Sequence, residues 1–174
     1  MDGSVRERAG VAEERRHPLN SGISAKIGSG SSDKTDGKSI GKNPIFEYKM
    51  KVRDYECDAQ GHVNNANYQH YFEVTRHELL DQVGLNFYEL HLKGVDAVVA
   101  RVDIRYKVPL IGMDEFICTI AKIERQNVKY IFHQEIIRQR DNALCAKAKI
   151  EVVNLVHGKL SRPDLFDEAL KEYI

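Results

Sequence analysis

The sequence has 174 residues, which is enough for one domain with a sizeable hydrophobic core but not for two domains of ordinary size. Its 26 Lys and Arg residues balance its 26 Asp and Glu residues, and this zero net charge argues against a protein that mainly neutralises nucleic-acid phosphates or an anionic membrane surface. Three cysteines without paired spacing exclude a disulfide framework or a CxxC metal site and favour a reducing compartment, and no apolar run approaches the ~18 residues of a spanning helix.

Residues 1–44 have the composition of a disordered tail. They hold seven of the twelve Gly residues and seven Ser residues, and their isolated apolar residues cannot bury enough surface to offset the entropy of ordering. The Arg and Ser content is similar to that of an organelle transit peptide, but such peptides avoid acids like Asp2, Glu7, Glu13 and Glu14. We expect a disordered tail on a cytoplasmic protein, with an organelle stroma or matrix as the alternative if the segment is a transit peptide.

Strong patterning begins at residue 45. In the run IFEYKMKV, apolar residues occupy every second position and alternate with Glu or Lys. A period of two residues is typical of a strand with one buried and one solvated face. We therefore predict the first strand here, with its buried face formed by Phe46, Tyr48, Met50 and Val52.

The period changes to that of a helix over residues 64–83. At 100° per residue, the apolar residues and one threonine fall within an arc of about 120°, as a core-facing helix requires. Asn64 is suited to cap the first turn, and Gly84 is suited to end the helix. The sequence thus predicts a long helix whose core-facing residues are Tyr68, Tyr71, Phe72, Thr75, Leu79 and Val83.

The remaining sequence is typical of strands joined by turns. Residues 116–123 are apolar on both faces, which places them centrally in a sheet or at an interface. Short connections favour antiparallel pairing of successive strands in a meander. The predicted fold class is α+β, with one long helix on one face of an antiparallel sheet of about five strands. The later elements are strands at 100–106, 116–123, 128–136 and 144–152 and a short helix at 163–173.

Polar groups suited to catalysis gather in residues 57–65, between the first strand and the long helix. The segment contains an acid, an amide, an imidazole and the start of a helix, whose free N–H groups are donors aimed at negative charge. Asp58 is a candidate general base or nucleophile, and the helix start would stabilise an oxyanion formed beside it. Taken singly, however, the acid and the imidazole of His62 fit an ordinary turn, and Asn64 and Asn65 fit a capped helix.

Two competing sites come from the same region. His70, Glu73 and His77 have the helical spacing of three metal ligands, but they lie opposite the core-facing arc, where a solvated face carries such residues. Cys57 is a candidate thiol nucleophile with His62 as its base. Because adjacent residues of an extended loop point to opposite sides, only one of Cys57 and the aspartate that follows it faces a substrate.

The motif D-A-Q-G-H-V-N-N-A-N-Y at 58–68, followed by Y-F-E at 71–73, closely resembles the signature of hotdog-fold acyl-CoA thioesterases of the 4-hydroxybenzoyl-CoA thioesterase type. The resemblance extends from about Phe46 to Leu155, in the order of elements as well as in the motif. It implies a hotdog domain at 45–174, in which a strongly curved antiparallel sheet wraps a long central helix. It also implies hydrolysis of acyl thioesters of coenzyme A or of acyl carrier protein, without a metal or other cofactor.

The resemblance assigns roles to residues of the motif. The family's acid falls on Asp58, as nucleophile or as general base. The backbone N–H that polarises the thioester carbonyl falls on the first turn of the helix, at or next to Asn65. Gly61 would let the backbone approach the substrate, consistent with its lack of a Cβ.

The D-x-x-x-H-V-N-N pattern is also similar to that of the plant acyl-carrier-protein thioesterases. In those enzymes the amide and the imidazole of this loop are catalytic, which points to Gln60 and His62, although this chain has Gln where that family has Asn. Those enzymes also use a later acid, and the corresponding stretch here, Val108–Pro109, contains none. Asp58 is therefore the principal catalytic candidate, together with His62 and Asn65. The expected substrate-binding residues are Gln60, Gly61, Val63 and Asn64.

We therefore expect a thioester hydrolase that acts on acyl-CoA or on acyl carrier protein. The alternative is a non-catalytic hotdog module that binds acyl chains or serves as a subunit interface. Pairing two subunits through their sheets would remove an exposed sheet edge, so we expect a homodimer or homotetramer. The resemblance to the hotdog thioesterases implies that the active sites lie at the interface between the paired subunits. We expect no nucleic-acid partner, and a nucleotide would enter only as part of coenzyme A.

Overall fold

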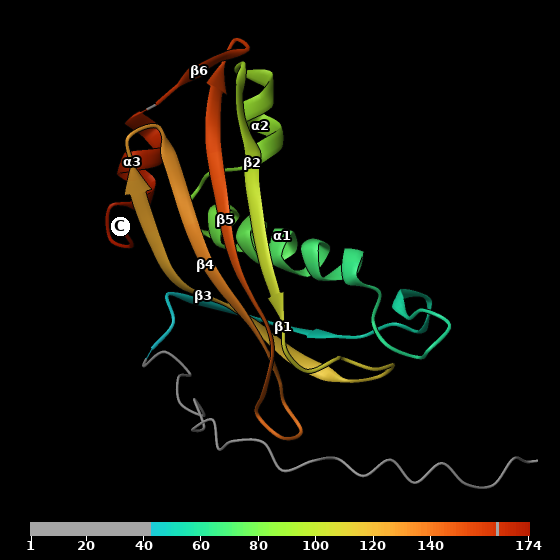
Figure 1. Ribbon diagram of the computed structural model, residues 1–174. Helices are drawn as coiled ribbons and strands as arrows, with labels where there is room; N and C mark the ends of the chain where they lie inside the picture. The colour runs from blue at the N-terminus through green and yellow to red at the C-terminus, as the bar shows by residue number, and fades with distance from the viewer. Residues whose placement is uncertain (1–42, 163) are drawn as a thin grey trace, which may run out of the picture. The chain divides into compact units, whose positions relative to one another are not determined.

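Residues 43–162 and 164–174 are described by the computed structural model (Figure 1). The predicted tail lies outside these residues except for its last two positions, and so does Pro163, the first residue of the predicted short helix. The strands are β1 (Phe46–Lys51), β2 (Val95–Tyr106), β3 (Glu115–Gln126), β4 (Lys129–Arg138), β5 (Ala143–Val156) and β6 (Lys159–Ser161). The helices are α1 (Asn65–Gln82), α2 (Phe87–Leu92) and α3 (Asp164–Leu170), with a 3-10 turn η1 (Asp54–Glu56) before α1.

The strands form one antiparallel sheet in the order β1-β3-β4-β5-β2, and β6 pairs with the end of β5. The predicted meander is confirmed for β3, β4 and β5, and β3 lies inside the sheet, as its two apolar faces indicate. The prediction is wrong for β2, which pairs with β5 and not with β3. The connection at 107–114 explains the difference, because it is too long for a hairpin and carries the chain across the sheet.

Helix α1 crosses one face of the sheet, and the sheet curves around it (Figure 1). The predicted core-facing arc is confirmed, since Tyr68, Phe72 and Leu79 are at most 3% exposed and belong to one core cluster with Phe116 and Phe132 of the sheet. Fully burying a side chain of this size contributes about 1.5–3 kcal/mol relative to exposure. This packing fixes the axis of α1 and therefore the place where the helix begins.

Both ends of α1 are as predicted. The Asn64 side-chain oxygen accepts a hydrogen bond from the Ala66 backbone N–H at 3.0 Å, which satisfies one of the free donors of the first turn. At the other end Gly84 has a φ of +81°, the left-handed conformation that commonly terminates a helix. The first residue of α1 is therefore Asn65, directly after the polar loop.

Two short elements, α2 and β6, were not predicted. Helix α2 has six residues and begins after Asn86, whose side chain accepts from the Glu89 N–H at 3.1 Å, and β6 has three residues. Segments this short contain too few residues for a period to be recognised. Among the helices of the described part of the chain, none is long and apolar enough to cross a membrane.

Strand β2 forms one edge of the sheet and has no neighbour on its outer side within the described residues. Val98, Val99 and Val102 on this strand are 37%, 48% and 38% exposed. A long edge strand with exposed apolar side chains is a template for pairing with another chain.

We predict that Asn64→Ala lowers the free energy of unfolding by about 1 kcal/mol, because the first turn of α1 loses its cap. Urea denaturation of the two proteins measures the difference. Glu78→Ala, an exposed substitution in the interior of the same helix, is the control and should have a smaller effect. Equal stabilities of wild type and Asn64→Ala would show that the cap contributes nothing.

Candidate active site

The polar loop between η1 and α1 is a tight turn closed by backbone hydrogen bonds. Cys57 and Val63 form an isolated β-bridge, and within it the Asp58 N–H donates to the His62 carbonyl at 2.8 Å. The Gly61 N–H donates to the Asp58 carbonyl at 3.0 Å, and Gly61 has a φ of +78°. A Cβ at Gly61 would meet no atom within 4 Å, so the turn requires glycine for its left-handed conformation and not for space.

The Asp58 carboxylate has one oxygen engaged in the turn. Its Oδ1 accepts from the Gln60 N–H at 2.8 Å and from the His62 N–H at 3.3 Å. Within the described residues, Oδ2 has no hydrogen-bond partner. The side chain therefore holds the loop with one oxygen and presents the other to solvent, which is compatible with both the structural and the chemical interpretations of this residue.

The start of α1 lies beside this carboxylate. The Asn65 backbone N–H is one of the free donors of the first turn, and no acceptor for it occurs in the part of the chain that the structure describes. On the opposite side of the same residue, the Tyr106 hydroxyl donates to the Asn65 carbonyl at 3.2 Å. Such an N–H, aligned with the positive end of the helix dipole, stabilises negative charge.

A pocket of about 280 Å³ joins these groups. Of the seven candidate site residues, it brings together Asp58, Val63 and Asn65. The other four, Gln60, Gly61, His62 and Asn64, are not among its lining residues. The rest of its wall is formed by Tyr68, Tyr106, Lys107, Val108 and Pro109.

None of these five further lining residues was predicted as a site residue. The Tyr68 hydroxyl accepts from the Leu110 N–H at 3.0 Å, and the Tyr68 ring meets the Tyr106 ring edge-on at 5.2 Å between centroids. Burial of the Tyr68 phenol raises its pKa, so it stays protonated. Lys107 follows directly on β2. No local signal marks Tyr106 or Lys107, because they reach the pocket only through the position of β2 at the sheet edge.

An arginine holds the connection that backs the pocket. Arg138 donates from Nε and Nη2 to the two carboxylate oxygens of Asp141 at 3.0 and 2.7 Å, and from Nη1 to the Pro109 carbonyl at 2.8 Å. Hydrogen bonds from Arg138 lower the Asp141 pKa to about 2. Leu110, next to Pro109, is fully buried and accepts from the Val63 N–H at 2.9 Å. The wall of the pocket is thereby tied to both β4 and the polar loop.

Cys57 does not fit the role of a thiol nucleophile. It is not among the residues that line the pocket. Partial burial, followed by the carboxylates of Asp54, Asp58 and Glu56, raises the pKa of the Cys57 thiol. Because the thiolate is the reactive form, this environment disfavours attack by Cys57.

The residues of the alternative metal site do not converge. His77 Nε2 lies 3.8 Å from the Glu73 carboxylate, while the His77 ring packs against Phe87 at 4.4 Å between centroids. His70 instead lines a groove beside Tyr48 of β1. Within residues 43–162 and 164–174, no group of three or more metal-ligating side chains comes together.

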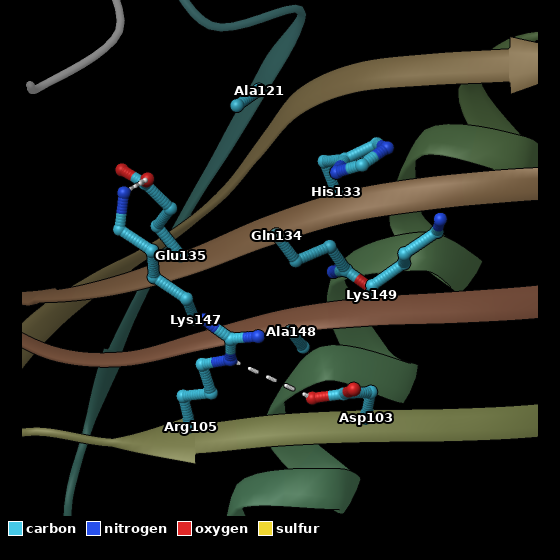
Figure 2. A pocket seen from close by; sticks show the side chains of 9 residues that line it. All are labelled: Asp103, Arg105, Ala121, His133, Gln134, Glu135, Lys147, Ala148 and Lys149. Carbon is cyan, nitrogen blue, oxygen red and sulfur yellow. Dashed lines mark ion pairs between the residues drawn. The ribbon is translucent and has the colours of Figure 1, made fainter.

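A second pocket, of about 270 Å³, lies on the face of the sheet away from α1 (Figure 2). Its charged residues pair with one another across and along strands, with Lys147 at 2.7 Å from Glu135 and Arg105 at 4.0 Å from Asp103. Cross-strand pairs of this kind are typical of a solvated sheet face. The pocket at Asp58 is therefore the better candidate for an active site.

Comparison with known proteins places the chain in a family. The sequence profile of the Thioesterase-like superfamily matches residues 52–174. The chain is 32% identical over 102 residues to an Arabidopsis thaliana protein described as acyl-acyl carrier protein thioesterase ATL3, chloroplastic, a match that covers 59% of this chain and 53% of that protein. It is 27% identical over 109 residues to the long-chain acyl-CoA thioesterase FadM of Escherichia coli, covering 62% and 81%. The chain thus spans only about half the length of the Arabidopsis relative.

Solved structures have the same fold. A 1,4-dihydroxy-2-naphthoyl-CoA thioesterase from Synechocystis superposes with a TM-score of 0.68 at 16% identity, covering 73% of this chain and 96% of the other. A protein of Aquifex aeolicus superposes with a TM-score of 0.64 at 31% identity, covering 72% and 98%. The predicted hotdog fold is confirmed by these neighbours together with the sheet order and the long helix. By profile, by sequence and by fold, the chain belongs to the Thioesterase-like superfamily.

Proposed function

We propose that the protein hydrolyses acyl thioesters of coenzyme A or of acyl carrier protein to a free acid and a thiol. The observation that carries the proposal is the pocket lined by Asp58 and by Asn65, the first residue of α1. Within the described residues, one oxygen of the Asp58 carboxylate has no hydrogen-bond partner. The names of the relatives, which include acyl-CoA and acyl-acyl carrier protein thioesterases, support it. The pocket is large enough to admit the reacting end of such a substrate.

The helix start supplies the electrostatic part of the reaction. With the thioester carbonyl placed against the Asn65 N–H, attack at the carbonyl carbon converts its oxygen to an oxyanion, which this donor and the helix dipole stabilise. One well-placed donor of this kind contributes on the order of 3 kcal/mol to the transition state. The Tyr106 hydrogen bond to the Asn65 carbonyl holds this residue in place.

The free oxygen of Asp58 drives the attack on the thioester carbonyl carbon, either as general base or as nucleophile. As general base, Asp58 takes a proton from water while the water oxygen bonds to the carbonyl carbon; the C–S bond then breaks, and the proton goes to the thiolate. As nucleophile, Asp58 itself bonds to the carbon and expels the thiolate, and water then hydrolyses the resulting anhydride and restores the carboxylate. In both routes the products are one carboxylic acid and one thiol.

The remaining motif residues have supporting roles in this proposal. Val63 offers the acyl group an apolar wall, while Gln60, Gly61 and Asn64 shape the loop that the thioester crosses. His62 is exposed on the loop and does not line the pocket. We therefore propose that it contacts the thiol part of the substrate as this part leaves, and that it takes no part in the attack on the carbonyl carbon.

A second candidate function is a non-catalytic acyl-binding or interface module. It is favoured by the structural use of the motif, since Asp58 closes the turn and Asn64 caps the helix. Release of free thiol from a panel of acyl-CoA substrates, followed with a thiol reagent, separates the two. Thiol release by the wild type above that of a buffer blank supports hydrolysis, and its absence supports the module.

The exposed edge of β2 is the surface through which we propose that subunits pair. Val98, Val99 and Val102 lie on the same strand as Tyr106, which lines the candidate site. Pairing of two β2 strands would join the sheets, cover these valines and place the pocket at the interface. The proposed assembly is a homodimer or a tetramer built from dimers.

Residues 1–44 are proposed to lie outside the thioesterase domain at 45–174. The family profile begins at residue 52, which is in accord with this division. We propose a cytoplasmic location, and the chloroplastic Arabidopsis relative keeps an organelle as the alternative. Expression of residues 1–44 fused to a fluorescent protein distinguishes the two, because a transit peptide carries the fusion into an organelle.

We predict that Asp58→Asn lowers kcat by at least about two to three orders of magnitude, because the free oxygen can no longer act as base or nucleophile. The amide oxygen still accepts from Gln60 and His62, so the turn and the melting temperature should be preserved. Asp164→Asn, an exposed aspartate at the start of α3 that does not line the pocket, is the matched control and should retain its activity. A variant that keeps more than about a tenth of the wild-type turnover would contradict the role of Asp58.

We predict that His62→Ala lowers kcat/KM by about tenfold or more while leaving the melting temperature nearly unchanged, since the side chain is exposed. Steady-state kinetics and thermal unfolding of the same preparation check both halves. His70→Ala, an exposed histidine of α1 away from the pocket, serves as the control. Unchanged kinetics in His62→Ala would return His62 to a purely structural role.

We predict that a protein lacking residues 1–43 remains a dimer or tetramer in light scattering, because the Gly- and Ser-rich segment offers little apolar area for an interface. Val99→Lys, which places a charge on the β2 edge, should instead dissociate the assembly. A folded, active monomer would overturn the interfacial active site. Loss of assembly on truncation would overturn the interpretation of the N-terminal segment.

A further inference from the structure

Arg76 is a buried cation that forms no ion pair with a carboxylate of residues 43–162 or 164–174. It lies on α1 and is only 6% exposed, although it falls outside the apolar arc that the sequence predicts. Its Nη1 donates to the Gln134 side-chain oxygen at 2.9 Å, and the Gln134 amide donates to the Phe72 carbonyl at 3.0 Å. Within the described residues, no carboxylate lies within ion-pair distance of the Arg76 guanidinium.

The other buried arginine is placed differently. Arg138 is 7% exposed, but both oxygens of Asp141 and the buried Asp114 surround it. Burying a charge is costly unless it is paired and hydrogen-bonded. Burial lowers the Arg76 pKa to about 10, with the Glu73 carboxylate acting in the opposite direction. Arg76 thus remains charged at neutral pH, and Gln134 is the one acceptor that the described part of the chain offers its guanidinium.

Arg76 lines a pocket of about 410 Å³ between α1 and β2. One wall is polar and consists of Gln69, Glu73 and Arg76. The other walls are apolar and consist of Ala97, Val98, Val99, Val102 and Ile150. An apolar pocket with one buried cation is suited to a ligand that has an apolar stem and an anionic end.

Like the candidate active site, this pocket is lined by residues of α1 and β2, and its α1 residues come later in the helix. Asn65 and Tyr106 line the first pocket, and Arg76 and Val102 line the second. Arg76 lies eleven residues after Asn65, which corresponds to about 16 Å along the helix axis. Side chains of a helix lean toward its N-terminus, so the guanidinium lies closer to the first pocket than the backbone does.

We propose that the pocket at Arg76 binds the far end of the acyl group and that Arg76 pairs with a carboxylate there. The favoured substrates are then thioesters of acyl groups with a second, terminal carboxylate. This inference rests on the proposed hydrolysis and names its substrate class. The guanidinium gains a counter-charge that no carboxylate of the described residues supplies, and the stem of the acyl group packs against the apolar walls of the pocket.

Glu73 sets a limit on this selectivity. Its side chain is 52% exposed and pairs with His77 at 3.8 Å, so water screens much of its charge. It lines the same pocket and still repels an incoming anion. Removing the charge of Glu73 should therefore act in the opposite direction to removing that of Arg76.

The test compares matched pairs of substrates: adipoyl-CoA with hexanoyl-CoA, suberoyl-CoA with octanoyl-CoA, and sebacoyl-CoA with decanoyl-CoA. Within each pair, a carboxylate replaces the terminal methyl. For the length that the wild type favours most, Arg76→Gln should lower the ratio of kcat/KM for the pair by about tenfold or more. Glu73→Gln should raise that ratio. The glutamine at position 76 keeps a donor for Gln134, and Arg76→Lys, which keeps the charge, should retain more of the ratio than Arg76→Gln.

Lys122→Gln, which removes a positive charge from an exposed position on β3, is the control and should leave the ratio unchanged. A ratio that Arg76→Gln does not alter at any chain length would overturn the proposal. So would conversion of the assembly to monomers by Arg76→Gln in light scattering, because the counter-charge would then come from a second copy of the chain.

Binding of free suberate separates failure of this inference from failure of the proposed hydrolysis. Suberate should raise the melting temperature of the wild type but not that of Arg76→Gln, and this readout needs no turnover. A protein that hydrolyses no acyl-CoA but shows this shift lacks the proposed activity and retains the carboxylate site. A protein that hydrolyses octanoyl-CoA yet shows neither the shift nor the change in ratio has the activity and lacks the site.

Discussion

The burial of α1 against the curved sheet is the constraint on which the site depends. One helix of 18 residues covers the inner face of the sheet, so its axis is set by the aromatic and aliphatic side chains packed on both sides of it. Once the axis is fixed, the first N–H of the helix has a fixed position. Two hydrogen bonds of Leu110 hold the connection at 107–114 and the polar loop close to that position. The Leu110 carbonyl accepts from the Val63 N–H, and the Leu110 N–H donates to the Tyr68 hydroxyl.

The polar loop contains both the residues that hold its own conformation and the candidate catalytic residue Asp58. Glu56 is an anchor of this loop, since its carbonyl accepts from the Asn67 side chain at 2.7 Å and its carboxylate accepts from the Tyr71 hydroxyl at 2.8 Å. Burial and the bond to Glu56 raise the pKa of Tyr71, so it serves as a donor and not as an acid. Asp58 closes its turn with one oxygen, while these contacts of Glu56 hold the preceding part of the loop. The second oxygen of Asp58 makes no hydrogen bond to the described residues.

Strand β2 contributes both to the candidate site and to the proposed subunit interface. Its last residue, Tyr106, is bonded to the start of α1, and its middle residues form the apolar wall of the pocket at Arg76. The same strand is an open edge of the sheet, with valines that are more than a third exposed. The proposed pairing through β2 would therefore affect both pockets, and mutations of its exposed valines are expected to change assembly and kinetics together.

Local patterns in the sequence determined much of this protein. The alternation in 45–52, the 3.6-residue period of 64–83, the cap at Asn64 and the stop at Gly84 depend on residues within one or two turns, and all of them are found in the structure. The motif at 58–68 also indicated where chemistry would gather, because a turn before a helix start is a local arrangement. These features required no knowledge of the partners across the sheet.

Only the tertiary structure decided which distant residues meet. The place of β2 beside β5 depends on pairing between segments about 50 residues apart, and with it came Tyr106 and Lys107 in the pocket and the open apolar edge. The burial of Arg76 likewise depends on Gln134, which is 58 positions away in the chain. Long-range contacts of this kind leave no period in the sequence, since their free energy comes from surfaces that exist only after the chain has folded.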